Sequence, residues 1–189
     1  MGPRKAAFTL LTMFATLALA VVAIVLVENP AVQAASAFAQ TRTKASQSLA
    51  IVVNRANPID NLSFGDLRKI FLGERNHWPN GHRIALAMLD YGRPERQAVL
   101  RLIYRMDENA YQDRLLRRMF RGDVFIAPRT LASPTIVRKY VFNAPGAISY
   151  VRASDVDDSV KVLRIDGLLP EDKDYRLVID EPAVNSTEP

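Results

Sequence analysis

Residues 67–81 constrain the fold more than any other part of the sequence. They start as an amphipathic helix whose apolar residues recur at spacings of three and four. Ser63, three residues ahead of Asp66, predicts where the helix begins, because this pair resembles a capping box. Gly73 predicts where it ends. Trp78, the only tryptophan, follows in a Trp-Pro-Asn-Gly turn, so we expect a buried side chain in an ordered helix-to-strand connection.

Strands and helices alternate along the rest of the chain. Apolar runs predict strands at residues 49–53, 83–90, 147–151 and 160–165. Further helices are predicted at residues 94–106, 108–121 and 134–142, and two of them have proline at the first position. Ser133 is the expected cap of the last helix. This order predicts an α/β fold, a three-layer sandwich whose mostly parallel sheet is flanked by helices.

Four parts of the chain, taken together, resemble a known family. They are Ile-Phe-Leu-Gly at 70–73, the Trp and Gly at 78 and 81, the strand that follows, and Asn-Ala-Pro-Gly-Ala-Ile-Ser-Tyr-Val at 143–151. Their order and spacing resemble the C-terminal lobe of phosphate-type periplasmic substrate-binding proteins, the binding subunits of ABC importers. The resemblance covers about residues 49–167. It implies one lobe of a type 2 periplasmic binding protein, whereas the family closes two lobes on its ligand.

The N-terminal sequence predicts where the domain is found. Arg4 and Lys5 precede an uncharged, apolar-rich run at residues 8–27, which at ~1.5 Å per residue spans a ~30 Å hydrocarbon core. The run fits a tether to the inner membrane. Residues 37–39, Ala-Phe-Ala, equally fit the cleavage site of a signal peptide. Either alternative predicts a periplasmic or otherwise extracytoplasmic domain.

These features divide the chain into four parts. Residues 1–39 are expected to form the signal peptide or transmembrane anchor, and residues 40–48 a small, polar tether. Residues 49–180 form the periplasmic-binding-protein-like domain, and residues 181–189 a disordered tail. The chain has no cysteine, so neither disulfides nor a lipid-modified cysteine can contribute.

A ligand is expected at residues 90–96, between a strand and the next helix. In an open α/β sheet such turns bind ligands, and helix amino ends favour anions. The family resemblance implies a Ser-Gly-Thr-type motif here, but residues 90–96 contain no serine or threonine, and their one hydroxyl group is that of Tyr91. Arg93 and Arg96 are the predicted ligand-binding residues, for phosphate or another small oxyanion. The alternative is that Glu95 satisfies the helix end and both arginines are solvated.

No catalytic set or metal-ligand pattern stands out, so we expect a non-enzymatic protein without a cofactor. Arg114, Arg117, Arg118 and Arg121 form one basic helix face. A solvated face is the simplest interpretation; anionic lipid is an alternative, and the extracytoplasmic address excludes nucleic acid. Two functions remain: a solute-binding protein of the phosphate ABC transport type, or a membrane-associated interaction module that docks on a membrane or envelope protein without binding ligand.

Overall fold

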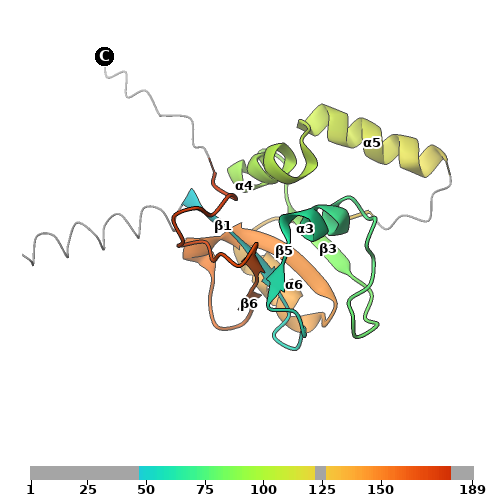
Figure 1. The fold of residues 1–189 in the computed structure, drawn as a ribbon. Coiled ribbons are helices and arrows are strands. Elements are labelled where there is room, and N and C mark those ends of the chain that lie inside the picture. The colour runs from blue at the N-terminus through green and yellow to red at the C-terminus, as the bar shows by residue number, and fades with distance from the viewer. Residues whose placement is uncertain (1–46, 122–126, 180–189) are drawn as a thin grey trace, which may run out of the picture. The chain divides into compact units, whose positions relative to one another are not determined.

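A five-stranded sheet lies at the centre of the computed structural model, which describes residues 47–121 and 127–179 (Figure 1). Its strands, in the order β4-β3-β5-β1-β6, are Arg129–Leu131, Ala85–Leu89, Ala147–Arg152, Leu49–Val53 and Lys161–Val162. β3 pairs in parallel with β4 and β5, whereas β1 is antiparallel to β5 and β6. All strands except β1 therefore run the same way, which confirms the predicted mostly parallel sheet. A short parallel pair, β2 (Asn61–Leu62) with β7 (Arg164–Ile165), lies beside it.

Helices cover both faces of the sheet (Figure 1). They are α3 (Phe64–Phe71), α4 (Pro94–Val99), α5 (Glu108–Phe120) and α6 (Pro134–Asn143). The chain moves from β3 outward to β4 and then back past β3 to β5. Because crossovers between parallel strands are right-handed, these opposite moves place α4 and α6 on opposite faces.

The predicted helix starts are confirmed. The Ser63 hydroxyl accepts a hydrogen bond from the Asp66 backbone N–H at 3.0 Å and donates one to the Asp66 carboxylate at 2.8 Å. Ser133 caps α6 in the same way, accepting from the backbone N–H of Ile136.

The helix predicted at residues 94–106 differs from the expectation. After α4 it continues as a π-helical turn, Leu100–Tyr104. Arg105 then adopts a left-handed conformation with φ of 58°, and the N–H of Met106 bonds the Leu100 carbonyl at 3.1 Å. The N–H of Arg105 bonds the same carbonyl, and this closure ends the helix early.

The Trp78 turn is ordered by contacts at both ends. The backbone N–H of Trp78 donates to the His82 carbonyl at 2.8 Å, and Gly81 supplies a positive φ of 82°. The indole is 2% exposed, and its Nε1 donates to the Gly146 carbonyl at 3.0 Å. The predicted burial of Trp78 is confirmed.

The last described segment packs against the start of β1. The Leu49 N–H donates to the Leu177 carbonyl at 2.8 Å, and the Tyr175 hydroxyl donates to the Leu49 carbonyl at 2.8 Å. Tyr175, Leu177 and Ile179 are all buried. The folded part of the chain therefore extends beyond residue 167, where the sequence resemblance ends.

Among residues 47–121 and 127–179, no helix combines the length and apolar character needed to cross a bilayer. The predicted signal peptide or anchor at residues 1–39 and the predicted tail at 181–189 lie outside the described residues.

Gly146 is required by space and not by an unusual backbone conformation. A turn this short suggests a positive φ, but the described glycines with positive φ are Gly73, Gly81, Gly92 and Gly167, so that expectation is wrong. A Cβ atom at Gly146 would instead lie 2.0 Å from the Arg83 carbonyl oxygen. This backbone crossing occurs where β3 and β5 begin to pair, since the Ala85 N–H donates to the Gly146 carbonyl at 3.0 Å.

Replacing Gly146 by alanine should therefore force the starts of β3 and β5 apart. We expect Gly146→Ala to lower the free energy of unfolding by about 1–3 kcal/mol or more, as overpacked sites do, measured by urea denaturation. Gly65→Ala is the matched control, because its Cβ would meet only the Ser63 hydroxyl at 3.8 Å. Within α3 that change should stabilise by up to about 1 kcal/mol. Equal stability of Gly146→Ala and wild type would contradict the close approach of the Gly146 and Arg83 backbones.

Candidate functional site

The carboxyl ends of β3 and β4 meet at one edge of the sheet. The Asp90 N–H donates to the Leu131 carbonyl at 3.0 Å, so the two turns that leave these strands start side by side. One turn leads into α4 and the other into α6. Ligands of open α/β sheets bind at such an edge, because strand ends and helix amino ends converge there.

Arg93 joins the two turns. Its side chain is exposed, and its Nη2 donates to the Ala132 carbonyl at 2.9 Å. Ala132 directly precedes Ser133, the cap of α6, and the first turn of α6 contains no acidic residue. The guanidinium of Arg93 therefore lies next to a ten-residue helix whose amino end carries partial positive charge. Thr135, in that first turn, is exposed.

Arg96 is in a different environment from Arg93. It is 2% exposed, and its Nε and Nη2 donate to the two carboxylate oxygens of Glu108, each at 2.8 Å. Its Nη1 donates to the Leu89 carbonyl at 3.0 Å. The rings of Tyr91 and Tyr111 lie 4.4 and 5.4 Å from the guanidinium carbon. Arg96 thus links β3, α4 and α5, and an anion from solvent would have to displace Glu108 to reach it.

Glu95 is also buried, at 5% exposure, and forms an ion pair with Arg152 at the end of β5. Its carboxylate makes no capping bond to α4, and the N-cap position, Arg93, contributes no side-chain cap either. The alternative that Glu95 satisfies the helix end while both arginines are solvated therefore does not describe this arrangement. The four residues 90–93 form the exposed part of the predicted site.

The basic face of α5 borders a separate hollow of about 530 Å³ near the end of α3. It is lined by Leu72, Glu74, Met106, Ala110, Arg114, Arg117, Arg118 and Arg121. Arg118 donates to the Leu72 carbonyl at 2.8 Å, so this guanidinium contacts the last turn of α3. Glu74 places a carboxylate in the same hollow.

The sequence did not indicate that the start of α6 would join the candidate site. Ser133 and Pro134 predicted a helix start but not its location. The start of α6 is brought next to the end of β3 because β4 pairs with β3, and β4 has only three residues, two of them exposed. Such a short polar strand has no periodic pattern. The usable signal was the Ser-Pro-Thr run at 133–135, which places a cap and a hydroxyl at a helix amino end.

Comparison with known proteins supports the fold. No family model matches the chain. An ABC-type phosphate transport receptor from Vibrio cholerae has 23% sequence identity and a TM-score of 0.54, covering 66% of this chain and 48% of that one. A putative phosphate ABC transporter substrate-binding protein with bound phosphate, from Clostridium perfringens, has 19% identity and a TM-score of 0.54, covering 66% and 47%.

PstS from Borrelia burgdorferi, with 14% identity and a TM-score of 0.50, is covered to a similar extent, 66% of this chain and 49% of that one. The chain thus spans just under half the length of these structures. At such identities the likeness establishes the fold. It confirms the predicted resemblance to one part of a phosphate-type substrate-binding protein.

The Arg96–Glu108 pair should make the domain sensitive to acid. Hydrogen bonds from Arg96 hold the pKa of Glu108 below its ordinary value of 4.5. A carboxylate with a depressed folded-state pKa stabilises fully above the unfolded pKa and loses that contribution as pH falls through the lower, folded value. We therefore expect the urea midpoint to fall as pH drops below about 4.5, and to fall less steeply in Glu108→Gln.

The control for this experiment is Asp113→Asn, which removes an exposed carboxylate from the same helix. It should leave the acid limb of the stability curve unchanged. Parallel acid limbs in wild type and Glu108→Gln would mean that the pair is not formed in solution.

Proposed function

We propose that this domain binds a small oxyanion such as phosphate, outside the cytoplasm, in the manner of a substrate-binding protein of ABC transport. Two of the solved structures with this fold carry phosphate transport in their descriptions, and one of them holds phosphate. The observation that carries the proposal is the position of Arg93. Its exposed guanidinium lies against the carbonyl that precedes α6, at the carboxyl edge of the parallel strands.

The chemistry of this edge suits an oxyanion. A guanidinium offers several N–H donors in a planar fork, which match the oxygen atoms of phosphate. The amino end of α6 adds partial positive charge. Its first turn offers the backbone N–H of Thr135, because Pro134 has none and that of Ile136 bonds the Ser133 hydroxyl. Arg96 contributes indirectly. Its hydrogen bonds to Leu89 and Glu108 position the turn that carries Arg93. Asp90 is the one exposed carboxylate in residues 90–93, and it opposes anion binding.

Binding by this domain alone should be weak. Good small-molecule sites bury about 70–90% of the ligand surface, whereas an edge of one lobe covers a ligand from one side only. The matching structures are about twice as long as the part that this chain covers. We infer that a second lobe would be needed for tight capture.

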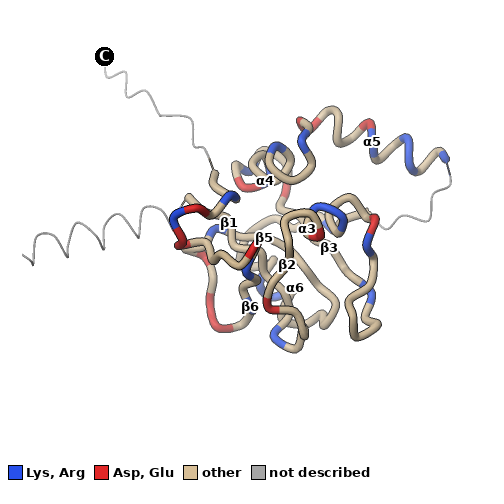
Figure 2. Tube along the Cα trace, in the orientation of Figure 1, with Lys and Arg blue, Asp and Glu red and all other residues tan. Residues whose placement is uncertain are grey.

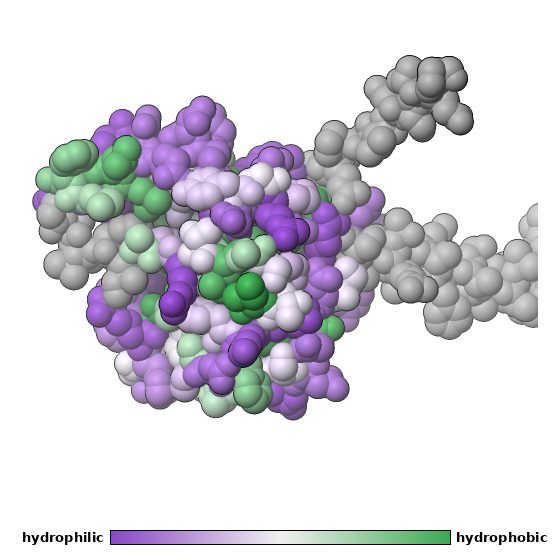
Figure 3. Space-filling model, turned by 180° about the vertical axis from the view of Figure 1, so that it is seen from behind, coloured by the Kyte–Doolittle hydropathy of each residue, from purple (hydrophilic) through white to green (hydrophobic). Residues whose placement is uncertain are grey.

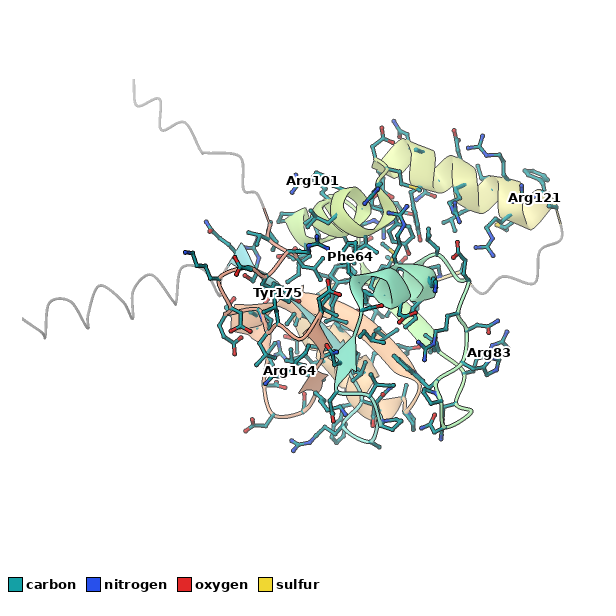
Figure 4. The ribbon with its side chains drawn as sticks, viewed as in Figure 1. Phe64, Arg83, Arg101, Arg121, Arg164 and Tyr175 are labelled. Atoms are coloured by element: carbon teal, nitrogen blue, oxygen red, sulfur yellow. The ribbon has the colours of Figure 1, made fainter. Side chains whose placement is uncertain are left out.

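Arg93→Ala should weaken phosphate binding by the full chain roughly ten- to hundredfold, because a hydrogen bond from a charged group contributes about 1.5–3 kcal/mol. Isothermal titration calorimetry with phosphate and sulfate measures the change. Arg93→Lys keeps the charge but not the planar fork, so it should bind with intermediate affinity. Arg83→Ala, which removes an exposed arginine before β3 (Figure 4), should bind as wild type does.

Each calorimetric outcome has a distinct meaning. Phosphate binding that survives Arg93→Ala unchanged would move the site away from this edge. If the wild-type chain binds neither anion, the alternative of an interaction module without a ligand would be favoured.

We propose an extracytoplasmic location from the sequence of the N-terminal part. Arg4 and Lys5 precede the apolar run at residues 8–27, and basic residues remain on the cytoplasmic side of such runs. This argument holds whether the run is retained as an anchor or removed as a signal peptide.

Alkaline phosphatase fused after Pro189 should therefore be active in a bacterial host, because that reporter folds only where its disulfides can form. Green fluorescent protein fused at the same position should be dark after export through the general secretory route. The reverse pair of results, an inactive phosphatase and a fluorescent fusion, would place the domain in the cytoplasm. Mass spectrometry of the purified chain distinguishes Gln40 as a new N-terminus from a retained apolar run.

A further inference from the structure

The end of α5 exposes large apolar side chains. Leu116, Met119 and Phe120 are 50%, 69% and 88% exposed, although their spacing of three and four is that of a buried helix face. Tyr111, one turn or more earlier, is 3% exposed. The helix is thus anchored to the domain at its start and extends away from the sheet at its end (Figure 1). We call Leu116, Met119, Phe120 and the adjacent Arg117 and Arg121 the α5 tip.

The apolar residues of the α5 tip form one cluster. At about 100° per residue, Met119, Leu116 and Phe120 occupy one side of the helix, and Arg117 follows next to Phe120. Figure 3 shows these apolar side chains as a green area at the end of α5, with purple hydrophilic residues next to it. Arg117 and Arg121 are both exposed, and Figure 4 places Arg121 at the very end of the helix.

The charge of the α5 tip narrows the choice of partner. Residues 114–121 include four arginines and no acidic residue, and the tube in Figure 2 is blue but not red over this half of α5. A second copy of the chain would bring like charges together around the apolar cluster, which opposes association. An anionic bilayer offers both an apolar interior and negative headgroups. Helices that lie in a membrane interface match this surface by combining apolar side chains with basic ones.

The length of the preceding chain is compatible with such a contact. Nineteen residues separate the apolar run at 8–27 from Gln47, and a chain of that length spans at most about 65 Å. If the run is retained in the membrane, the domain cannot move beyond that distance from the bilayer surface. A weak interfacial contact is then favoured by its high effective concentration.

We propose that the α5 tip docks on the surface of an anionic phospholipid bilayer. Leu116, Met119 and Phe120 enter the interface between headgroups and acyl chains. Arg117 and Arg121 extend their long side chains to lipid phosphates. The contact is separate from the oxyanion edge at Arg93 and does not require that edge to bind a ligand.

The absence of cysteine allows a direct test in the full chain. Met119→Cys is labelled with a polarity-sensitive dye, and Phe142→Cys, on α6 and 56% exposed in the wild type, is the matched control. Each labelled chain is combined with vesicles of phosphatidylcholine and phosphatidylglycerol whose acyl chains are brominated. A tether holds both labels near the membrane equally, so only docking of the α5 tip distinguishes them.

The label at position 119 should shift to the blue and be quenched by the bromines, whereas the label at 142 should stay accessible to aqueous acrylamide. Pure phosphatidylcholine should lower the immersed fraction. Replacing Arg117 and Arg121 by Gln should lower the ratio of immersed to exposed label about fivefold for each arginine.

Equal acrylamide quenching at positions 119 and 142 in anionic vesicles would overturn the proposal. Protection of position 119 without vesicles, increasing with protein concentration, would also overturn it and assign the α5 tip to contact between copies of the chain. A wild-type chain that binds no phosphate but shows normal immersion of position 119 would overturn the oxyanion proposal and leave docking intact, so the two proposals fail independently.

Discussion

The buried guanidinium of Arg96 is the interaction on which the candidate site depends. A charge inside a protein is tolerated only when hydrogen-bonded partners replace water. Arg96 obtains them from three elements: the Leu89 carbonyl at the end of β3, both carboxylate oxygens of Glu108 at the start of α5, and the ring faces of Tyr91 and Tyr111. Moving any of these groups would remove a partner from the buried charge. The turn at residues 90–93 is therefore held between fixed points while its own side chains stay exposed.

The same residue shows where sequence reasoning succeeds and where it stops. Apolar periodicity and caps predicted β1, α3, α5 and α6 to within one or two residues, because these signals are local. Nothing local distinguishes Arg93 from Arg96, two arginines three positions apart in one turn. The partner that buries Arg96 lies twelve residues further on and across a helix end. The exposure of Leu116 and Phe120 could not be predicted from the sequence either. Their spacing is that of a buried helix face, and only the path of α5 leaves them uncovered.

The residues that carry the family resemblance contact one another. The Trp78 indole donates to the Gly146 carbonyl, and the Gly146 Cα approaches the Arg83 carbonyl so closely that no side chain fits. A tryptophan turn and a Pro-Gly-Ala run, 68 residues apart, are thus two halves of one packing arrangement. Their presence indicates how the strands are joined and carries no information about a ligand.

The position of that arrangement explains how fold and ligand chemistry can change separately. Trp78 and Gly146 lie where β3 and β5 begin, whereas Arg93 follows the carboxyl end of β3. The strand-joining residues and Arg93 are thus at opposite ends of the parallel strands. We expect substitutions at one end to leave the packing at the other unchanged. A chain can keep the strand-joining residues of a phosphate-type lobe and carry Tyr-Gly-Arg where a hydroxyl motif is expected. Function must then be derived from the carboxyl ends of the strands themselves, where we propose that an exposed arginine beside the amino end of α6 binds an oxyanion.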